Sequence, residues 1–252
     1  MKVFLQRMNQ GSAKLSKEEA AVYQHCLIHN IPIVRVDLND TPLPSSIHNA
    51  DLVVGNVPFV HRCLSALGIT HKPIDYYPEC LKPFLHREIR SLTAMELVNL
   101  IQSSKISDVF AKPKELKLFT GKVFSFNSNI DELLNLPPDT PLLVSPVMKF
   151  LCEYRIYIIN HQIVASCRYD DNPDDDLAID MAVVSSAIDE LQRNTFDPVA
   201  YCLDFGLLSN GKTALVEVTD GYALGRYRGI NDADYFTLLK LRWNQLVETG
   251  IR

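Results

Sequence analysis

Two carboxylates stand in segments that otherwise have the pattern of buried β-strands. Asp204 lies in the segment AYCLDFGLL, and Glu217 lies in TALVEV shortly after it. The dipeptide Asn210-Gly211 between them favours a two-residue hairpin turn, and such a turn places Asp204 directly opposite Glu217. Strand alternation puts the hydroxyl of Thr219 on the same face. The pattern predicts a cluster of oxygen ligands suited to Mg²⁺, with a solvent-facing sheet edge as the alternative.

A second hairpin brings arginines into the same region. The dipeptide Asn160-His161 is a weaker turn signal, and a two-residue turn there places Glu153 opposite Arg168. Arg155 projects from the same face as Glu153. Guanidinium groups match phosphate oxygens, so two arginines beside an acidic pair suggest a phosphate clamp. The plainer interpretation is an ion pair on the protein surface.

Lysines and a glycine loop add a third candidate for phosphate binding. Lys112 ends the strand DVFAK, and the loop KLFTGK that follows contains Lys117, Thr120 and Gly121. A tight turn at Gly121 offers backbone N–H groups to phosphate oxygens. Alone, this pattern is also that of any short hairpin.

The elements that must position these residues fall into two groups. The predicted fold class is α/β (α+β), with a parallel α/β unit over residues 1–75 and a region of antiparallel hairpins over residues 76–252. Capping-box patterns begin helices at Ser16 and Thr93. The predicted strands are 1–5, 31–37, 51–55, 108–113, 121–126, 141–147, 152–159, 162–169, 200–208 and 213–218, and the predicted helices are 16–29, 93–103, 131–136, 172–193 and 233–247.

Composition limits the class of protein. The chain has 252 residues, 47% of them apolar, and a formal net charge of −5, which argues against a nonspecific nucleic-acid binder. The six cysteines show no CxxC spacing, which is typical of reduced core cysteines in a cytoplasmic protein. The start of the sequence lacks the apolar run of a signal peptide, and no segment is long enough to span a membrane.

Several of these segments together resemble a known family. A lysine in AKP, the loop KLFTG, the tripeptide EYR, and DFG followed by EVTDGYALG are similar to motifs of the ATP-grasp superfamily. Within it, the chain resembles the small RimK-related clade of amide ligases, over about residues 77–230. The region before it is similar to the pre-ATP-grasp domain of that family.

The resemblance implies roles for individual residues, with ATP and Mg²⁺ as cofactors. Lys112 and the loop would meet the nucleotide phosphates, and the backbone around Ser145 and Val147 would meet adenine. Arg155 would hold the terminal phosphates and an acyl phosphate. The remaining implied assignments are nucleotide binding for Lys117, Thr120, Gly121 and Glu153, a second clamp for Arg168, and Mg²⁺ binding for Asp204, Glu217 and Thr219.

The chain departs from the family pattern at two positions. Thr219 stands where the family usually has asparagine, and Pro146, which has no backbone N–H, stands where an acidic residue is usual. The resemblance also suggests that Mg²⁺ with ATP is the positive partner that Glu217 requires. On that basis, Asp204→Asn and Glu217→Gln would relieve repulsion and leave the ligand-free protein at least as stable.

The resemblance implies a ligase that joins a carboxylate to an amine through an acyl phosphate. The substrates would be small molecules or peptides, with neither nucleic acid nor membrane as a partner, and the oligomeric state is open. Two other classes fit the same residues. A nucleotide-binding module without catalysis would show slow ATP hydrolysis that is independent of an amine, and a small-molecule kinase would release a stable phosphorylated product.

Overall fold

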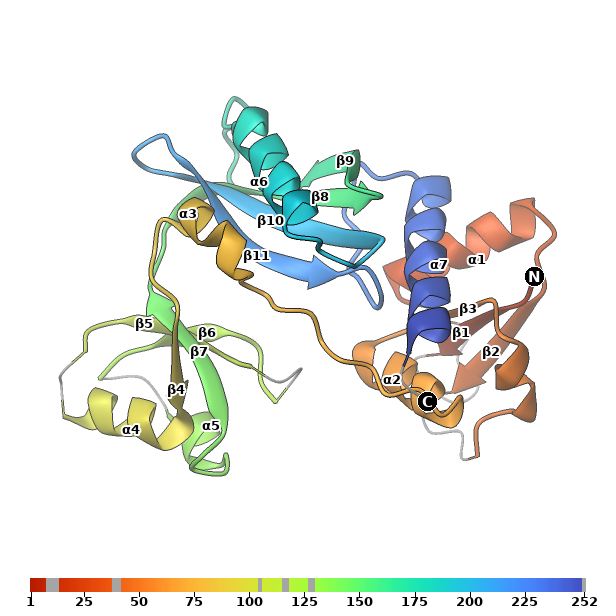
Figure 1. Cartoon of the computed structure of the whole chain (residues 1–252), viewed down its shortest axis with the longest axis horizontal. Helices are drawn as coiled ribbons and strands as arrows, with labels where there is room; N and C mark the ends of the chain where they lie inside the picture. Colours follow the sequence, from red (N-terminus) through yellow and green to blue (C-terminus); the bar gives the residue numbers. More distant parts are fainter. Residues whose placement is uncertain (8–13, 38–41, 104–105, 115–117, 127–129, 251–252) are drawn as a thin grey trace.

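The strands of the described residues form three separate sheets (Figure 1). One sheet is parallel and two are antiparallel, which confirms the predicted α/β (α+β) class. In the described part of the chain, no helix combines the length and the apolar character that crossing a membrane requires. The computed structural model describes residues 1–7, 14–37, 42–103, 106–114, 118–126 and 130–250.

The N-terminal unit is a parallel sheet in the order β2-β1-β3, as the alternating pattern predicts. The Ser16 side chain accepts hydrogen bonds from the backbone of Glu18 and Glu19 and so begins α1 at the predicted place. Asn56 caps a helix that the sequence analysis missed. The elements are β1 (Val3–Arg7), α1 (Lys17–Ile28), β2 (Ile33–Asp37), η1 (Ser45–Asn49), β3 (Leu52–Val54) and α2 (Val57–Ala66).

The last helix belongs to the core of this first unit. In α7 (Asp232–Thr249), Tyr235 and Trp243 are buried in the same apolar cluster as Phe4 and Val22. Figure 1 shows α7 beside α1 and the parallel sheet. Residues from both ends of the sequence therefore share one core, a contact that local patterns do not reveal.

The small sheet has the order β4-β7-β5-β6 and carries α4. The predicted capping box begins α4, because Thr93 and Glu96 each bond the other's backbone. The edge strand β4 was not among the predicted strands. The elements are β4 (Arg90–Thr93), α4 (Ala94–Gln102), β5 (Val109–Pro113), β6 (Lys122–Phe124), α5 (Asp131–Leu134) and β7 (Pro141–Pro146).

The central sheet has the order β11-β10-β8-β9, and α6 covers one of its faces. The predicted helix 172–193 in fact begins at residue 181, because Asp180 caps it. Two short helices that precede the small sheet in the chain pack into the same apolar cluster as α6. The elements are η2 (Glu79–Leu81), α3 (Lys82–Leu85), β8 (Phe150–Ile159), β9 (Gln162–Arg168), α6 (Met181–Arg193), β10 (Ala200–Leu208) and β11 (Thr213–Asp220).

Candidate active site

Asp204 and Glu217 lie directly opposite each other on β10 and β11, as predicted. The predicted two-residue turn is wrong, however. Leu208 N–H bonds Lys212 C=O, and Gly211 takes a left-handed φ of 79°, so three residues form the turn. A β-bulge between the Phe205–Leu215 and Asp204–Glu217 pairs leaves Val216 without a partner and corrects the register. The longer turn and the bulge each shift the strand register by one residue, in opposite directions, so the two shifts cancel at Asp204 and Glu217.

Arg155 on β8 lies on the other side of Asp204. Its Nε and Nη2 donate to the two carboxylate oxygens of Asp204 at 2.8 and 2.6 Å, and both side chains are buried. Burial raises the pKa of Asp204 against the opposing effect of Arg155. Burial lowers the pKa of Arg155, and the bonds with Asp204 raise it by more. Asp204 has a fixed cationic partner before any ligand binds.

Lys112 joins the small sheet to the central sheet. It extends from β5, and its Nζ donates to Glu217 Oε2 on β11. The ammonium group also lies 3.8 Å from the ring centre of Tyr76 and 4.7 Å from that of Tyr77. Burial lowers the pKa of Lys112, but Glu217 and Tyr77 together raise it to a net increase. The expectation that Mg²⁺ with ATP alone satisfies Glu217 is therefore wrong, because Lys112 already does so in the ligand-free protein.

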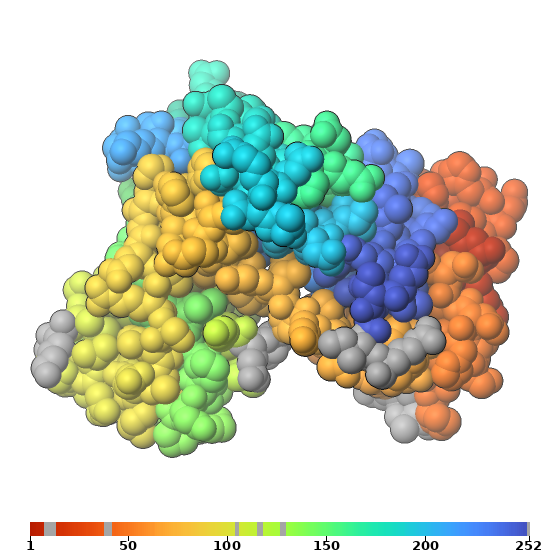
Figure 2. All heavy atoms as spheres, in the orientation of Figure 1, coloured from red at the N-terminus to blue at the C-terminus, as the bar shows by residue number. Residues whose placement is uncertain are grey.

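A cleft of about 950 Å³ runs between the small sheet and the central sheet. Figure 2 shows the small sheet and its helices (yellow and green) below the central sheet, with the N-terminal unit (red and orange) on the right. Asp204 is 3% exposed and is not part of the cleft wall. The structure brings the other described candidates together, with the exception of Arg168, because the wall includes Lys112, Thr120, Gly121, Ser145, Val147, Glu153, Arg155, Glu217 and Thr219.

Residue 121 must be glycine because its backbone lies very close to side chains of β5. A Cβ atom there would lie 2.6 Å from Phe110 Cζ and 3.0 Å from Lys112 Cβ. Glycine therefore lets this loop pack against β5 where Lys112 enters the cleft. Of the other loop residues in the sequence-based hypothesis, Lys117 lies outside the described residues.

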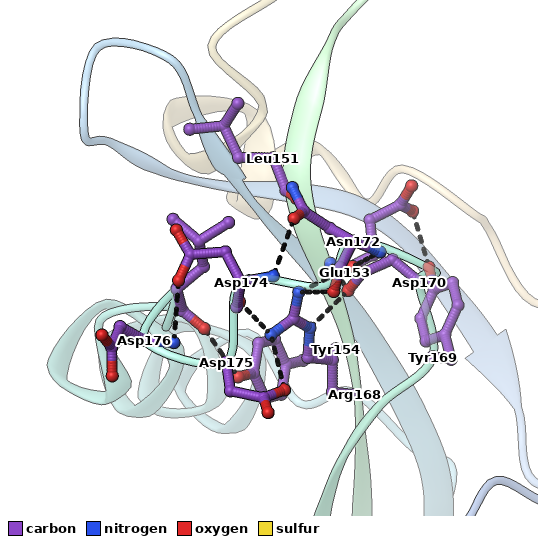
Figure 3. A network of polar contacts seen from close by, with 11 residues as sticks. Leu151, Glu153, Tyr154, Arg168, Tyr169, Asp170, Asn172, Asp174, Asp175 and Asp176 are labelled. Carbon is purple, nitrogen blue, oxygen red and sulfur yellow. Dashed lines mark hydrogen bonds and ion pairs between the residues drawn. The ribbon is translucent and has the colours of Figure 1, made fainter.

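Arg168 does not reach the cleft. The predicted turn at Asn160-His161 forms with positive φ at both residues, but a bulge then shifts the register, so Arg168 pairs with Tyr154 and not with Glu153. Figure 3 shows the guanidinium inside the 170–176 loop, bonded to the Asp170 carboxylate. It also donates to the carbonyl groups of Asn172 and Asp174 at 2.8 and 2.7 Å. The predicted pairing is wrong, and the geometry gives Arg168 a structural contact in place of a phosphate.

We expect Arg168→Met to leave the KM for ATP within about threefold of the wild-type value, because this side chain is outside the cleft between the small and central sheets. The 170–176 loop should instead become more susceptible to proteolysis, since Arg168 is its internal cation. The matched variant Arg155→Met should raise the KM for ATP strongly. A large rise with Arg168→Met would show that the arginine turns into the cleft when nucleotide binds.

The oxygen atoms on the cleft face fit a magnesium ion. Thr219 Oγ1 is buried and has no hydrogen-bond partner in the described structure, and Thr219 forms part of the cleft wall beside Glu217. A buried hydroxyl without a partner carries a desolvation cost that a ligand can offset. The described residues contain no cluster of three or more His, Cys, Asp or Glu suited to a metal. Glu217 and Thr219 on the cleft wall, with the buried Asp204 opposite Glu217, are instead consistent with an ion that keeps water and phosphate ligands.

Two substitutions at Thr219 test this fit. Thr219→Asn should lower the Mg²⁺ concentration at half-maximal activity about fivefold, corresponding to roughly 1 kcal/mol for a longer, stronger oxygen ligand. The isosteric Thr219→Val should raise that concentration, yet leave the melting temperature of the ligand-free protein unchanged or higher. Titrations with Mg²⁺ at saturating ATP measure both effects. Equal midpoints in all three proteins would place Thr219 away from the metal.

The cleft also contains residues that the sequence analysis missed. Tyr76 and Tyr77 precede the short helices η2 and α3, and Arg87 follows them. Outside the cleft wall, the Tyr227 ring lies 5.1 Å from the Arg155 guanidinium and stacks on Tyr169. Neither a motif nor a periodic pattern marks these positions, because they come together only through the fold.

Comparison with known proteins points to one family. Residues 84–238 match the family described as ATP-grasp domain, R2K clade family 2. No curated protein matches the chain. The fold is similar to that of the D-cycloserine synthetase DcsG, with a TM-score of 0.60 and 12% identity, covering 98% of this chain and 100% of that one.

Two further solved structures share the fold. D-alanine–D-alanine ligase from Bacillus anthracis, complexed with ATP, has a TM-score of 0.58 and 14% identity, covering 100% of each chain. The macrocyclase MdnC from Microcystis aeruginosa MRC, bound to its precursor peptide MdnA, has a TM-score of 0.53 and 12% identity, covering 98% of this chain and 100% of that one. At these identities the likeness concerns the fold.

Proposed function

Because the chain belongs to the ATP-grasp R2K clade, family 2, we propose that it is an ATP-dependent ligase that joins a carboxylate to an amine. The nucleotide would lie in the cleft between the small and central sheets. The observation that carries the proposal is the Lys112–Glu217 pair across that cleft, next to the Arg155–Asp204 pair of the central sheet. Two cations and two carboxylates at one place form a site for polyanionic phosphate and its metal.

The ion pairs supply the charges that the reaction needs. Lys112 and Arg155 would turn from their carboxylates toward phosphate oxygens, leaving Asp204, Glu217 and Thr219 to hold Mg²⁺. When bound, the ion neutralises charge on the phosphates. Thr120 and Gly121 would line the phosphate end, while Ser145 and Val147 would lie along adenine. Glu153 would remain oriented by the Tyr169 hydroxyl, which donates to it at 2.7 Å.

The chemistry would proceed in two transfers. A carboxylate oxygen of the first substrate attacks the γ-phosphorus of ATP, and ADP leaves with the electrons of the broken P–O bond. The amine of the second substrate then attacks the carbonyl carbon of the acyl phosphate, loses a proton and expels inorganic phosphate. Arg155 would stabilise charge on the transferred phosphoryl group in both steps, so positioning and electrostatics do most of the catalysis.

The substrates would be small molecules or peptides. The fold neighbours include a D-alanine–D-alanine ligase and a macrocyclase with a precursor peptide, so we include both amino acids and peptides as carboxylate and amine donors.

All six cysteines are free and five are buried, which favours a reducing, cytoplasmic compartment.

The test is release of ADP in the presence of Mg²⁺, measured against pools of amino acids and peptides, with mass spectrometry for condensed products. Ligation requires that ADP release depends on both a carboxylate and an amine. A stable phosphorylated product would instead identify a kinase. Nucleotide binding with slow hydrolysis that is independent of any amine would identify a binding module.

A further inference from the structure

The bulge at Val216 decides which face of the central sheet carries Glu217. Nearer the turn, Phe205 pairs with Leu215, and beyond the bulge Leu203 pairs with Val218. All four side chains are buried in the cluster beneath α6. If the register near the turn continued without the extra residue, Glu217 would lie opposite Leu203 and point into that apolar cluster. The bulge therefore turns Glu217 toward the cleft.

Arg87 is bonded to the bulge itself. Its Nη1 donates to the Leu215 carbonyl and its Nη2 to the Val216 carbonyl, both at 2.7 Å. Adjacent carbonyl groups of a regular strand point to opposite sides, so one guanidinium can take both only because the bulge has turned them together. The planar guanidinium group of Arg87 thus binds two carbonyl groups that face the same side only in the bulged strand.

Two backbone features of the segment before Arg87 position it beside β11. His86 ends α3 with a left-handed φ of 50°, which redirects the backbone at that point. Upstream, the Tyr76 carbonyl accepts a hydrogen bond from Val218 N–H at 3.0 Å. Since β11 is an edge strand, these contacts satisfy backbone groups on its open side, immediately before and after Glu217.

We infer that Arg87 is a positioning residue, which holds the Val216 bulge and thereby aims Glu217 at the magnesium ion of the bound nucleotide. This inference rests on the proposed function. Arg87 also forms part of the cleft wall, so direct contact with the nucleotide is the competing role. The two roles differ in how they depend on Mg²⁺.

The test measures ADP binding by calorimetry over a series of Mg²⁺ concentrations and in EDTA. Arg87→Ala should raise the Mg²⁺ concentration at half-maximal binding about tenfold, which is typical for loss of a group that orients a metal ligand. Arg87→Lys should give a similar shift, because one ammonium does not reproduce the fork to two carbonyl groups. Metal-free ADP affinity should stay within about twofold of wild type, since Glu217 acts through the metal.

A metal-free measurement addresses the bulge directly. Hydrogen exchange at residues 215–218 should be faster in both Arg87 variants than in wild type, because the bulge has lost its clamp. Arg90→Ala is the matched control. This exposed arginine three residues on pairs with Glu88, and its loss should change neither the midpoint nor the exchange.

Three results would overturn the inference. An equal loss of ADP affinity in EDTA would make Arg87 a nucleotide ligand. If folded Arg87→Ala needs the same Mg²⁺ concentration for half-maximal ADP binding as wild type, Arg87 does not position Glu217. If Arg87→Lys has the wild-type Mg²⁺ midpoint, the two hydrogen bonds of the guanidinium to the bulge are not required. Arg87→Lys keeps the charge and most of the stem, so it carries the test if Arg87→Ala does not fold. If wild type itself binds no ADP with Mg²⁺, the proposed function fails, whereas the exchange measurement still tests the clamp.

Discussion

Asp204→Asn is expected to abolish turnover and to lower the free energy of unfolding of the ligand-free protein by roughly 3 kcal/mol. The Arg155 and Asp204 side chains are 10% and 4% exposed and share two hydrogen bonds, so the substitution leaves a buried guanidinium without its counter-charge. Urea denaturation of the purified protein without nucleotide measures the change. This direction is opposite to the expectation from sequence, which treated the two acids as mutually repelling groups.

A double substitution separates stability from activity. Asp204→Asn combined with Arg155→Met removes both charges, so it should recover most of the lost stability while remaining inactive. Asp189→Asn, which neutralises an exposed carboxylate on α6, is the control for charge removal. An Asp204→Asn protein as stable as wild type would mean that the buried ion pair contributes nothing to the fold.

Lys112→Met should weaken binding of ADP with Mg²⁺ by about 10- to 100-fold, corresponding to one charged hydrogen bond of about 1.5–3 kcal/mol. Methionine keeps an unbranched side chain against Tyr76 and Tyr77, so the change is mainly in charge. Isothermal titration calorimetry measures the affinity, and a coupled assay should show a parallel loss of turnover.

Lys114→Met provides a close control for this substitution. Lys114 is exposed, lies two residues along the chain, and loses the same charge without being part of the wall of the cleft that Lys112 lines. Its ADP affinity should equal that of wild type. If both lysine variants lose affinity to the same extent, the effect comes from the overall charge of the small sheet, and the ammonium of Lys112 has no specific contact.

The chain itself determined the chemistry of the site and the strands that hold it. Apolar segments around Asp204 and Glu217, together with the turn signal at Asn210-Gly211, located the hairpin that carries the two acids, and the Ser16 and Thr93 caps fixed helix starts. These predictions succeed because strand alternation, turn residues and caps act over a few neighbouring residues. The ATP-grasp resemblance rested on the same local motifs and is confirmed by the family match.

Only the tertiary structure decided which charges meet. The partners of Glu217 and Asp204 lie 105 and 49 residues away in the sequence, and the bulge that keeps Glu217 on the cleft face is bonded by Arg87 from 128 and 129 residues away. A second bulge likewise moved Arg168 out of its predicted pairing and into its own loop. A one-residue bulge reverses the face of every later side chain, and long-range contacts determine whether it forms, so sequence alternation alone does not predict it.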